Sequence, residues 1–560
     1  MTAHLLIGPV LRRVVGDKAT IWVETTEPAL VRVEAAGGGA GSAPTFSAYE
    51  HHYALVIVEG LRPDAASEYR VLLDDRQVWP PAESAYPPSV IRTRAAVDGE
   101  QPVTFIFGSC REATPHATGR RLPPDALDAY SRRLMAAPDD RDRRPDLIVL
   151  LGDQVYADNT SAKVRRFLHR RRSAGYHGPA NEVVSFDEYT KLYLESWRDP
   201  EVRWLFATVP SVMIFDDHEI IDDWNTSASW RTDVAREPWW HERIRSGLAS
   251  YWVYQHLGNL SPAELTADPL YAKVTAAGEA TALLEEFGHS VDEPSSADNT
   301  DRPYQWSFAL EVGRTRLVML DNRCNRVLTR GRREMLPAQE WQWFVDRTTG
   351  DYDHLVVGSS LPWLMPPAIH HLEAWNERGA DSPRSRTAAF AEKLRRSFDL
   401  EHWAAFTRSF DALGELFRRL GEGVPGGRVG AGPAYAAPAT ISVLSGDVHH
   451  SYVARADLGA QTRTPVYQLT CSPIHNQVPA FMRPLMRLSW SRLVATSVRG
   501  LARSAGVARP KLRWVREAGP YFGNAISTLR HDGARAIVRV EGTTKDGELF
   551  DVAQVTLHDH

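Results

Sequence analysis

A chain of 560 residues is too long for one small core, so its length suggests a large catalytic domain with one or more additions. The composition, 43% hydrophobic and 24% charged with no sustained low-complexity tract, is typical of a soluble globular protein and excludes a disordered one. A net charge of -5 excludes an overall basic surface, and we expect no specific nucleic-acid binding.

The cysteine count and the N-terminal sequence indicate which cysteine chemistry and which cellular location to expect. Three widely spaced cysteines fit neither a disulfide framework nor a four-thiolate zinc site. The short apolar stretch at the N-terminus contains Pro9 and is followed by Arg12 and Arg13, which does not fit a secretory signal. With no run of eighteen apolar residues, we expect a cytoplasmic protein without a transmembrane segment.

Residues 1–98 predict an all-β sandwich module. Short β-type runs alternate here with Gly, Pro and Asp turn signals. The segment 61–73, in which a Leu and a Pro precede a Tyr-led strand, is similar to fibronectin type III modules. The runs are ATIWVET, ALVRVEAA, HHYALVIVEG, SEYRVLLDD and SVIRTRA.

Residues 99–560 predict one catalytic domain of the α/β (α+β) class. From residue 103 onward, fully apolar strands end abruptly in polar or small residues, as in sheets that are covered by helices on both faces. Chemistry in such folds collects beyond the carboxyl ends of the strands. The strands are VTFIFGSC, DLIVLLGDQVY, SVMIFDDHE, RLVMLDNR, HLVVGSS, ISVLSGDVHH and VYQLTCSP.

The stretches between these strands, and the end of the chain, add to this core. Residues 160–205, 226–300 and 375–435 are expected to form helical insertions that wall the cleft. The last runs, GNAISTLRH, ARAIVRVEG and LFDVAQVTLHD, predict a β-meander that could complete a second sheet.

The run LLGDQVYADN delivers Asp153 from an apolar strand into a turn, with Tyr156 and Asp158 beyond it. A carboxylate at a strand end can bridge two metal ions, and a phenol oxygen can bind one of them. The alternative is an ordinary Gly-Asp turn.

The run FDDHEIIDDWN crowds acidic residues around His218 directly after an apolar strand. Clustered carboxylates repel one another unless cations or water compensate them, which favours a metal site. The alternative is a solvated helix start with Asp216 as its N-cap and Glu219 three residues later.

The run VLSGDVHHSY places Asp447 and His449 one residue apart at a strand end, with His450 following. This spacing lets two side chains of one turn reach adjacent metals, and we favour ligands over structural histidines. Cys110 ends the first core strand, where a thiolate could bind metal or act as a nucleophile. The alternative for Cys110 is simple burial.

Two arginines at strand ends could bind phosphate. Arg111 follows Cys110, and Arg323 lies in LDNRCNR; a guanidinium in such a place can form bidentate bonds to phosphate oxygens. The alternative is an ion pair, which we prefer for Arg326.

Taken in order, these motifs resemble the PhoD-like alkaline phosphatases, a branch of the metallophosphoesterases. The resemblance covers about residues 100–475, and the opening GPVLRRVVGDKATIWVET looks like the β-sandwich module often found before that core. The motifs are Gly108-Ser109-Cys110, Gly152-Asp153 with Tyr156, Asp216-Asp217-His218-Glu219, Asp321 with Arg323, and Ser445-Gly446-Asp447-Val448-His449.

The resemblance implies a four-layer fold, in which two packed mixed sheets are flanked by helices, and a site that holds Fe³⁺ and Ca²⁺. By matching position, the iron ligands would be Cys110, Asp153, Tyr156 and His449. Asp153 would bridge to calcium, and Asp447 would lie on the calcium side. Thiolate and phenolate donors suit a transition ion and carboxylates suit calcium, so zinc or manganese is less favoured.

The remaining roles concern the second metal and the acid. Asp217 stands where the wider superfamily has a metal-binding asparagine, and Asn225 competes for that role. His218, oriented by Glu219, would stabilise developing charge or protonate the leaving oxygen. Arg323 would assist catalysis, and Arg111, Arg323 and His450 would contact the substrate.

Residues 481–516 lie outside the core motifs and contain eight Arg and one Lys but no acidic residue. Such a segment could be a lid that presents positive charge to anionic substrates, a surface that makes weak contact with anionic lipid, or a solvated helix.

The leading hypothesis is hydrolysis of phosphate esters, mono- or diesters, by a metal-activated hydroxide acting on a small substrate. A catalytically silent binding protein, with a recognition sandwich and a structural metal core, is the alternative. Hydrolysis with Cys110 as nucleophile is a third, and it predicts inactivation by thiol alkylation. The oligomeric state is left open.

Overall fold

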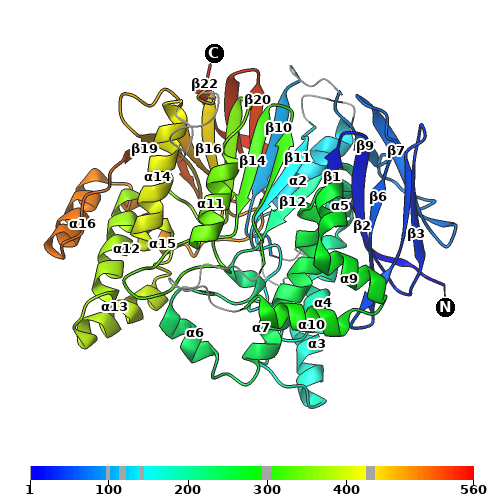
Figure 1. Ribbon diagram of the computed structural model, residues 1–560, viewed down its shortest axis with the longest axis horizontal. Helices are drawn as coiled ribbons and strands as arrows, with labels where there is room; N and C mark the ends of the chain where they lie inside the picture. The colour runs from blue at the N-terminus through cyan, green and yellow to red at the C-terminus, as the bar shows by residue number, and fades with distance from the viewer. Residues whose placement is uncertain are drawn as a thin grey trace.

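The structure is a computed structural model that describes residues 2–95, 101–112, 122–138, 140, 144–292, 304–423 and 436–559. The predicted domain boundary between residues 98 and 99 lies outside these ranges. The N-terminal sandwich (blue in Figure 1) lies on the opposite side of the central strands from helices α12 and α16. None of the helices in the described ranges has the length and apolar character needed to cross a bilayer.

The N-terminal module is the predicted all-β sandwich. One sheet has the order β1-β2-β6-β5, and the other has the order β4-β3-β7-β8 with β9 paired to β7. Alternate residues of β3 and β7 fill the space between them. The strands are β1 (Leu5–Val15), β2 (Lys18–Thr25), β3 (Leu30–Ala35), β4 (Ala40–Pro44), β5 (Phe46–Ala48), β6 (His51–Val58), β7 (Ala66–Leu73), β8 (Arg76–Trp79) and β9 (Val90–Arg92).

The first core sheet has six strands in the order β12-β11-β10-β20-β21-β22. Strands β10, β11 and β12 run parallel, and β20 pairs antiparallel with β10. The C-terminal meander therefore extends this first sheet, whereas the sequence suggested that it completes a second one. The strands are β10 (Val103–Gly108), β11 (Leu147–Leu151), β12 (Ser211–Ile214), β20 (Ala525–Asp532), β21 (Arg535–Thr543) and β22 (Leu549–His558).

The second core sheet has seven strands in the order β13-β14-β15-β16-β18-β17-β19. Its central strands β14, β15, β16 and β18 are parallel, and antiparallel strands flank them. The strands are β13 (Phe308–Val312), β14 (Thr315–Leu320), β15 (His354–Ser359), β16 (Thr440–Ser445), β17 (Ser451–Asp457), β18 (Val466–Thr470) and β19 (Arg513–Tyr521).

The two core sheets pack face to face between helices, which confirms the predicted four-layer α/β core. Phe105 and Phe107 of β10 enter the layer between the sheets together with Met319 of β14, whereas Ile106 and Val318 face the helices outside. Side chains of a strand alternate between its faces, so a strand that is apolar at every position is buried on both. The prediction that the seven continuous apolar runs are strands is therefore confirmed.

Helices occupy the stretches between the strands. Those from residues 162–290 cover the first sheet, and those from 338–421 cover the second. They are α2 (Ala126–Ala136), α3 (Ala162–Ser173), α4 (Phe186–Trp197), α5 (Pro200–Thr208), α6 (Ala228–Val234), α7 (Trp240–Tyr251), α8 (Pro262–Ala267), α9 (Pro269–Ala277), α10 (Thr281–Ser290), α11 (Ala338–Arg347), α12 (Pro367–Ala380), α13 (Ser385–Ser397), α14 (Thr407–Gly421), α15 (Met482–Leu488) and α16 (Arg492–Ser504), with short turns η1 (Asp217–Glu219), η2 (Trp252–His256), η3 (Leu257–Asn259) and η4 (Trp403–Ala405).

The sandwich shares a core with the catalytic domain. Trp22 of β2 packs edge-on against Trp197 and at 5.2 Å from the ring of Tyr254. Arg12 of β1 is fully buried and donates hydrogen bonds to the carbonyl oxygens of Ser211 and Tyr254, both at 3.1 Å. Burial lowers the pKa of Arg12 to about 9. The module is thus joined to the core through buried contacts of β1 and β2.

Candidate active site

The site lies where strands of both core sheets end. Cys110 follows β10, Asp153 follows β11 and Asp217 follows β12, all from the first sheet. Asp447 and His449 follow β16 of the second sheet. Carboxyl ends of parallel strands meet at one edge of a sheet, so residues that are hundreds of positions apart converge here.

Four of these residues have left-handed backbone conformations. The φ angle is 58° at Cys110, 53° at Asp153, 65° at Asp447 and 49° at His449. A non-glycine residue in this region costs about 1–3 kcal/mol, and such residues cluster at functional sites. The surrounding structure therefore holds these four residues in an unfavourable backbone conformation. This conformation sets the direction in which each side chain points.

Two glycines let the loops approach one another. A Cβ on Gly446 would lie 2.0 Å from the hydroxyl oxygen of Ser109, across the boundary between the two sheets. Gly152 has a φ of 105°, and a Cβ there would lie 2.5 Å from the Cβ of Asp216. The glycines of both strand-end motifs are thus needed for contact between loops.

A cluster of buried carboxylates forms the centre of the site. Oxygen atoms of Asp153, Asp216, Asp217 and Asp447 lie within 4.8 Å of one another. Asp153 Oδ1 and Asp216 Oδ2 are buried and accept no hydrogen bond from any residue in the described ranges. Burial raises the pKa of Asp153 and Asp216 well above the ordinary value, and burial raises that of Asp217 to about 7. Such a cluster is the electrostatic environment that a bound cation relieves.

Sulfur and phenol donors lie beside this cluster. Cys110 Sγ is 3.3 Å from Asp153 Oδ2 and accepts a hydrogen bond from the Ser472 hydroxyl at 3.2 Å. The Tyr156 hydroxyl accepts a hydrogen bond from Asn476 at 3.0 Å. Burial raises the pKa of Cys110 and of Tyr156 well above their ordinary values. A fully buried thiol with a raised pKa does not suit the nucleophile hypothesis, whereas a cation would favour thiolate and phenolate.

The half-buried His449 lies two residues after Asp447, in the same turn. Its backbone N–H donates to the Ser472 hydroxyl at 3.1 Å, which fixes the turn. Among the described residues, two groups of donor atoms fall within 4.8 Å of one another, and neither group includes the ring of His449 or the thiol of Cys110.

Arg323 is the buried counter-ion of the carboxylates. Its guanidinium is fully buried and pairs with Asp216 and Glu401, and its remaining nitrogen lies 3.4 Å from both Asp217 and Asp447. Each side of the group therefore faces a carboxylate. The predicted contact between Arg323 and substrate phosphate is not available in this arrangement.

His218 is fixed by Asp158, not by Glu219 as the sequence suggested. Nδ1 of His218 lies 2.9 Å from both carboxylate oxygens of Asp158. Burial lowers the pKa of His218, but the charges of Asp158 and Asp153 outweigh it and raise that pKa well above the ordinary value. Glu219 instead accepts backbone N–H bonds from Asp153, Gln154 and Asp216, so it shapes the two loops.

A second histidine, His402, contacts the cluster from the other side. Its Nε2 lies 3.2 Å from Asp447 Oδ2, and its Nδ1 lies 2.7 Å from Glu373 on α12. The side chains of His218 and Asp447 are 22% and 20% exposed, and we call this exposed part of the site its mouth. Among the described residues of the cluster, Asp153, Asp216 and Asp217 are almost fully buried.

Three predicted site residues have other partners. Arg111 is buried and bonds to Asp125 at 2.8 Å, so it does not face a substrate. Asn225 accepts a bond from Arg231 at 2.8 Å through its Oδ1, the atom that would bind a metal. His450 is fully buried, and burial lowers its pKa to about 4.

The structure also identifies site residues that the sequence interpretation missed as participants. Asp216 belonged to the predicted acidic motif, with a helix cap as the alternative, but it was given no ligand role; Asp158 was noted without a role. Glu401 and His402 lie in an insertion without a strand pattern, and their one signal was the acid-rich run DLEHW. No sequence pattern around Glu373 on α12 indicated a role in the site.

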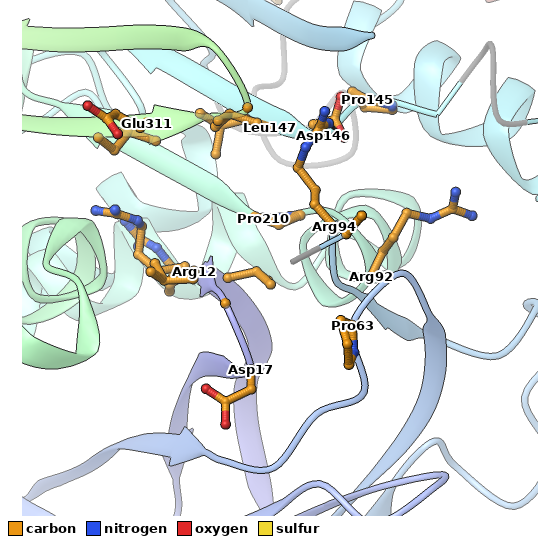
Figure 2. Close-up of a pocket in the computed structure, with 18 of the residues that line it drawn as sticks. Arg12, Asp17, Pro63, Arg92, Arg94, Pro145, Asp146, Leu147, Pro210 and Glu311 are labelled. Carbon is orange, nitrogen blue, oxygen red and sulfur yellow. Dashed lines mark hydrogen bonds and ion pairs between the residues drawn. The ribbon is translucent and has the colours of Figure 1, made fainter. Parts of the chain in front are cut away.

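A cavity of about 410 Å³ lies at the opposite edge of the first sheet, beneath the sandwich (Figure 2). Its lining includes Leu147 at the start of β11 and Pro210 before β12, at the amino ends of the strands. Arg94 points to Asp146 at 3.0 Å, and Arg144 donates to the carbonyl of Thr208 at 2.9 Å. The Arg94–Asp146 pair joins the sandwich side of this cavity to the core, and the Arg144 bond lies within the core. The cavity is at the opposite edge from the carboxylates, so we assign it a structural role and not a catalytic one.

The two-sheet α/β fold and the buried carboxylates, with a thiol, a phenol and imidazoles at the strand ends, define a metal-binding hydrolase. The family model for PhoD-like phosphatases matches residues 128–486. The chain belongs to the PhoD-like phosphatase family. Family and fold together indicate a metal-dependent phosphoester hydrolase.

A second family model covers the sandwich, and one solved structure supports the fold. A domain of unknown function, DUF7800, matches residues 2–91, which form the sandwich. The solved structure described as "Structure of PhoD" aligns with a TM-score of 0.58 at 13% identity and covers 98% of this chain and 88% of that chain. The match to a maltogenic amylase from S. marinus covers 99% of this chain and 82% of that chain at 8% identity. Its TM-score of 0.15 is too low to indicate a shared fold. No curated protein sequence matches the chain significantly.

Proposed function

We propose that this protein hydrolyses phosphate monoesters or diesters at a centre that holds Fe³⁺ and Ca²⁺. One observation carries the proposal: four carboxylates share a buried space, two of their oxygen atoms lack hydrogen-bond donors among the described residues, and Cys110 lies beside them. Arg323 supplies one positive charge against these carboxylates, and a metal centre would offset the remaining repulsion in a medium of low dielectric constant.

The donor chemistry divides the site into two halves. Cys110, Asp153, Tyr156 and His449 would hold iron, because thiolate and phenolate donors suit a transition ion. Asp153, Asp217 and Asp447 would hold calcium, because calcium prefers carboxylate oxygens. Asp217 is preferred over Asn225, since the amide oxygen of Asn225 already accepts a bond from Arg231.

When bound, such a centre lowers the pKa of a water molecule and offsets the charge of the phosphoryl group. His218 would donate a proton from Nε2 to the leaving oxygen, because Asp158 holds Nδ1 and the ring is partly exposed at the mouth. Arg323 and His402 keep Asp447 in position through their contacts with its two oxygens.

The first experiment compares the purified protein with Asp153→Asn on chromogenic phosphate mono- and diesters at alkaline pH with added calcium. We expect the variant to lose more than about 100-fold in kcat/KM, because Asp153 would hold both metals, and the loss of an outer-shell partner alone typically costs about 10- to 100-fold. Asp351→Asn is the matched control, since its 86% exposed carboxylate lies before the amino end of β15. Equal rates for the wild type and Asp153→Asn, with metals bound, would favour a catalytically silent binding protein.

The iron assignment has a separate spectroscopic test. A visible absorption band from phenolate-to-iron charge transfer is expected in the wild type and is lost in Tyr156→Phe. Tyr176→Phe, at a 55% exposed tyrosine, should keep the band. A colourless and fully active zinc enzyme would contradict the assignment.

A further inference from the structure

Helices α15 and α16 expose a set of large apolar side chains that the site does not use. The exposed fractions are 80% for Phe481, 65% for Leu485, 55% for Leu488, 81% for Leu493 and 45% for Leu501. We call these five residues the α15–α16 face. Large apolar side chains gathered within so short a segment are uncommon on a surface that contacts only water.

The spacing of these residues gives each helix one apolar side. Phe481, Leu485 and Leu488 are four and three residues apart, which places them on one side of α15. Leu493 and Leu501 are eight residues apart on α16. Between them, a Cβ on Gly500 would meet nothing within 4 Å, so this side of the helix faces open space.

The charge of the same segment is entirely positive. Residues 481–516 contain no Asp or Glu. Arg487, Arg492 and Arg503 are exposed, and they form no ion pair with any residue that the structure describes. Acidic side chains of the described residues therefore do not neutralise these three charges.

The inner sides of both helices are fixed to the core. Helix α16 packs against α12 at the outer edge of the molecule (Figure 1), with Ala502 buried in the contact. The carbonyl of Ser489 accepts the backbone N–H of Ala368 at 3.2 Å, and Trp490 packs edge-on against Tyr452. The α15–α16 face is therefore exposed to solvent on helices that pack against the core. Its side chains do not form a lid over the site.

We propose that the α15–α16 face binds the surface of an anionic lipid bilayer. On amphipathic helices that lie at a membrane surface, leucine and phenylalanine side chains insert into the boundary between headgroups and acyl chains. Neighbouring arginines pair with lipid phosphates. A second copy of the chain would set arginines against arginines across a two-fold axis, which is repulsive. Binding of nucleic acid would use the arginines but leave the five apolar side chains without a role.

The face lies one helix away from the site. Glu373, which holds His402, belongs to α12, against which α16 packs. Asn476, which donates to Tyr156, precedes Phe481 by five residues. Binding at the α15–α16 face would therefore hold the enzyme at a bilayer through elements that also support the carboxylate cluster.

The test is cosedimentation of the full chain with vesicles of phosphatidylglycerol and phosphatidylcholine mixed one to one, and with vesicles of phosphatidylcholine alone. We expect binding to the mixed vesicles only, weaker at high salt. The double variant Leu485→Glu/Leu493→Glu should abolish it, and Arg492→Gln/Arg503→Gln should lower partitioning about 25-fold.

Matched controls keep the result specific to this face. Leu30→Glu changes an exposed leucine of β3, and Arg166→Gln/Arg170→Gln removes two exposed arginines from α3. Both should bind vesicles as the wild type does. The unfolding midpoint of every variant shows whether it folds, independently of catalytic activity.

Two results would overturn the proposal. One is equal vesicle binding by the wild type and the double glutamate variant. The other is a wild type that does not bind the mixed vesicles. If this wild type sediments as a dimer, and the glutamate substitutions dissociate the dimer, the face binds a second copy of the chain instead.

Discussion

Replacement of Asp158 by asparagine tests how His218 is held. Asp158 contacts Nδ1 of His218 with both oxygens at 2.9 Å and also accepts the backbone N–H of Asp222 at 2.7 Å. Its carboxylate is 9% exposed, so the interaction is poorly screened. A hydrogen bond between charged groups contributes about 1.5–3 kcal/mol, which corresponds to a loss of roughly 10- to 150-fold in rate. In Asp158→Asn, the amide can keep the Asp222 bond but no longer favours the charged imidazolium.

The assay compares two substrates that differ in their leaving group. An alkyl phosphate needs a proton on its leaving oxygen, whereas a nitrophenyl phosphate leaves without one. We therefore expect Asp158→Asn to reduce kcat about 10- to 150-fold for the alkyl ester and only slightly for the nitrophenyl ester. Asp222→Asn is the control, because its 65% exposed carboxylate lies 3.9 Å from Nε2 of His218. An equal loss for both substrates would refute the proton-donor role.

Three further outcomes are expected. Gly446→Ala should lower stability by about 1–3 kcal/mol in urea unfolding, because its Cβ would overlap Ser109, whereas Gly500→Ala should not. His354 and His531 stack at 3.9 Å between the sheets, and burial lowers the pKa of both. The unfolded chain then binds more protons at these two positions, so their contribution to stability is complete above about pH 6.5 and is lost as the pH falls towards the lowered pKa values, at up to about 1.4 kcal/mol per pH unit and histidine. Stability of His354→Gln/His531→Gln should therefore fall less between about pH 7 and 5 than that of the wild type, and parallel profiles would contradict this. Metal chelation should lower the unfolding midpoint of the wild type but not that of Asp153→Asn, as calorimetry can check.

The strands and the residues at their ends could be predicted from the sequence. A strand such as DLIVLLGD is apolar at every position because both of its faces are buried, and this pattern is local. The polar residue that follows the strand is local too, so Asp153 could be found without knowing its neighbours. The pairing order could not be predicted, because nothing in GNAISTLRH indicates that it pairs with β10 more than 400 residues earlier.

The direction of each polar side chain was the other feature that the sequence did not determine. Arg111 and Arg323 both follow strand ends, yet Arg111 pairs with Asp125 and Arg323 pairs with Asp216 in the carboxylate cluster. Such partners are chosen by tertiary packing. The same holds for His218, whose partner is Asp158 and not the adjacent Glu219.

The origin of the ligands in two sheets has a consequence for how the protein is made. Cys110 comes from the first sheet and Asp447 from the second, and the first sheet is completed only when β20 from the C-terminus pairs with β10. The carboxylate cluster can therefore form only after the ribosome has synthesised the chain beyond Asp447, which is about four fifths of its length. The proposed metals would bind only then, so a bound ion would mark a chain in which both sheets have met.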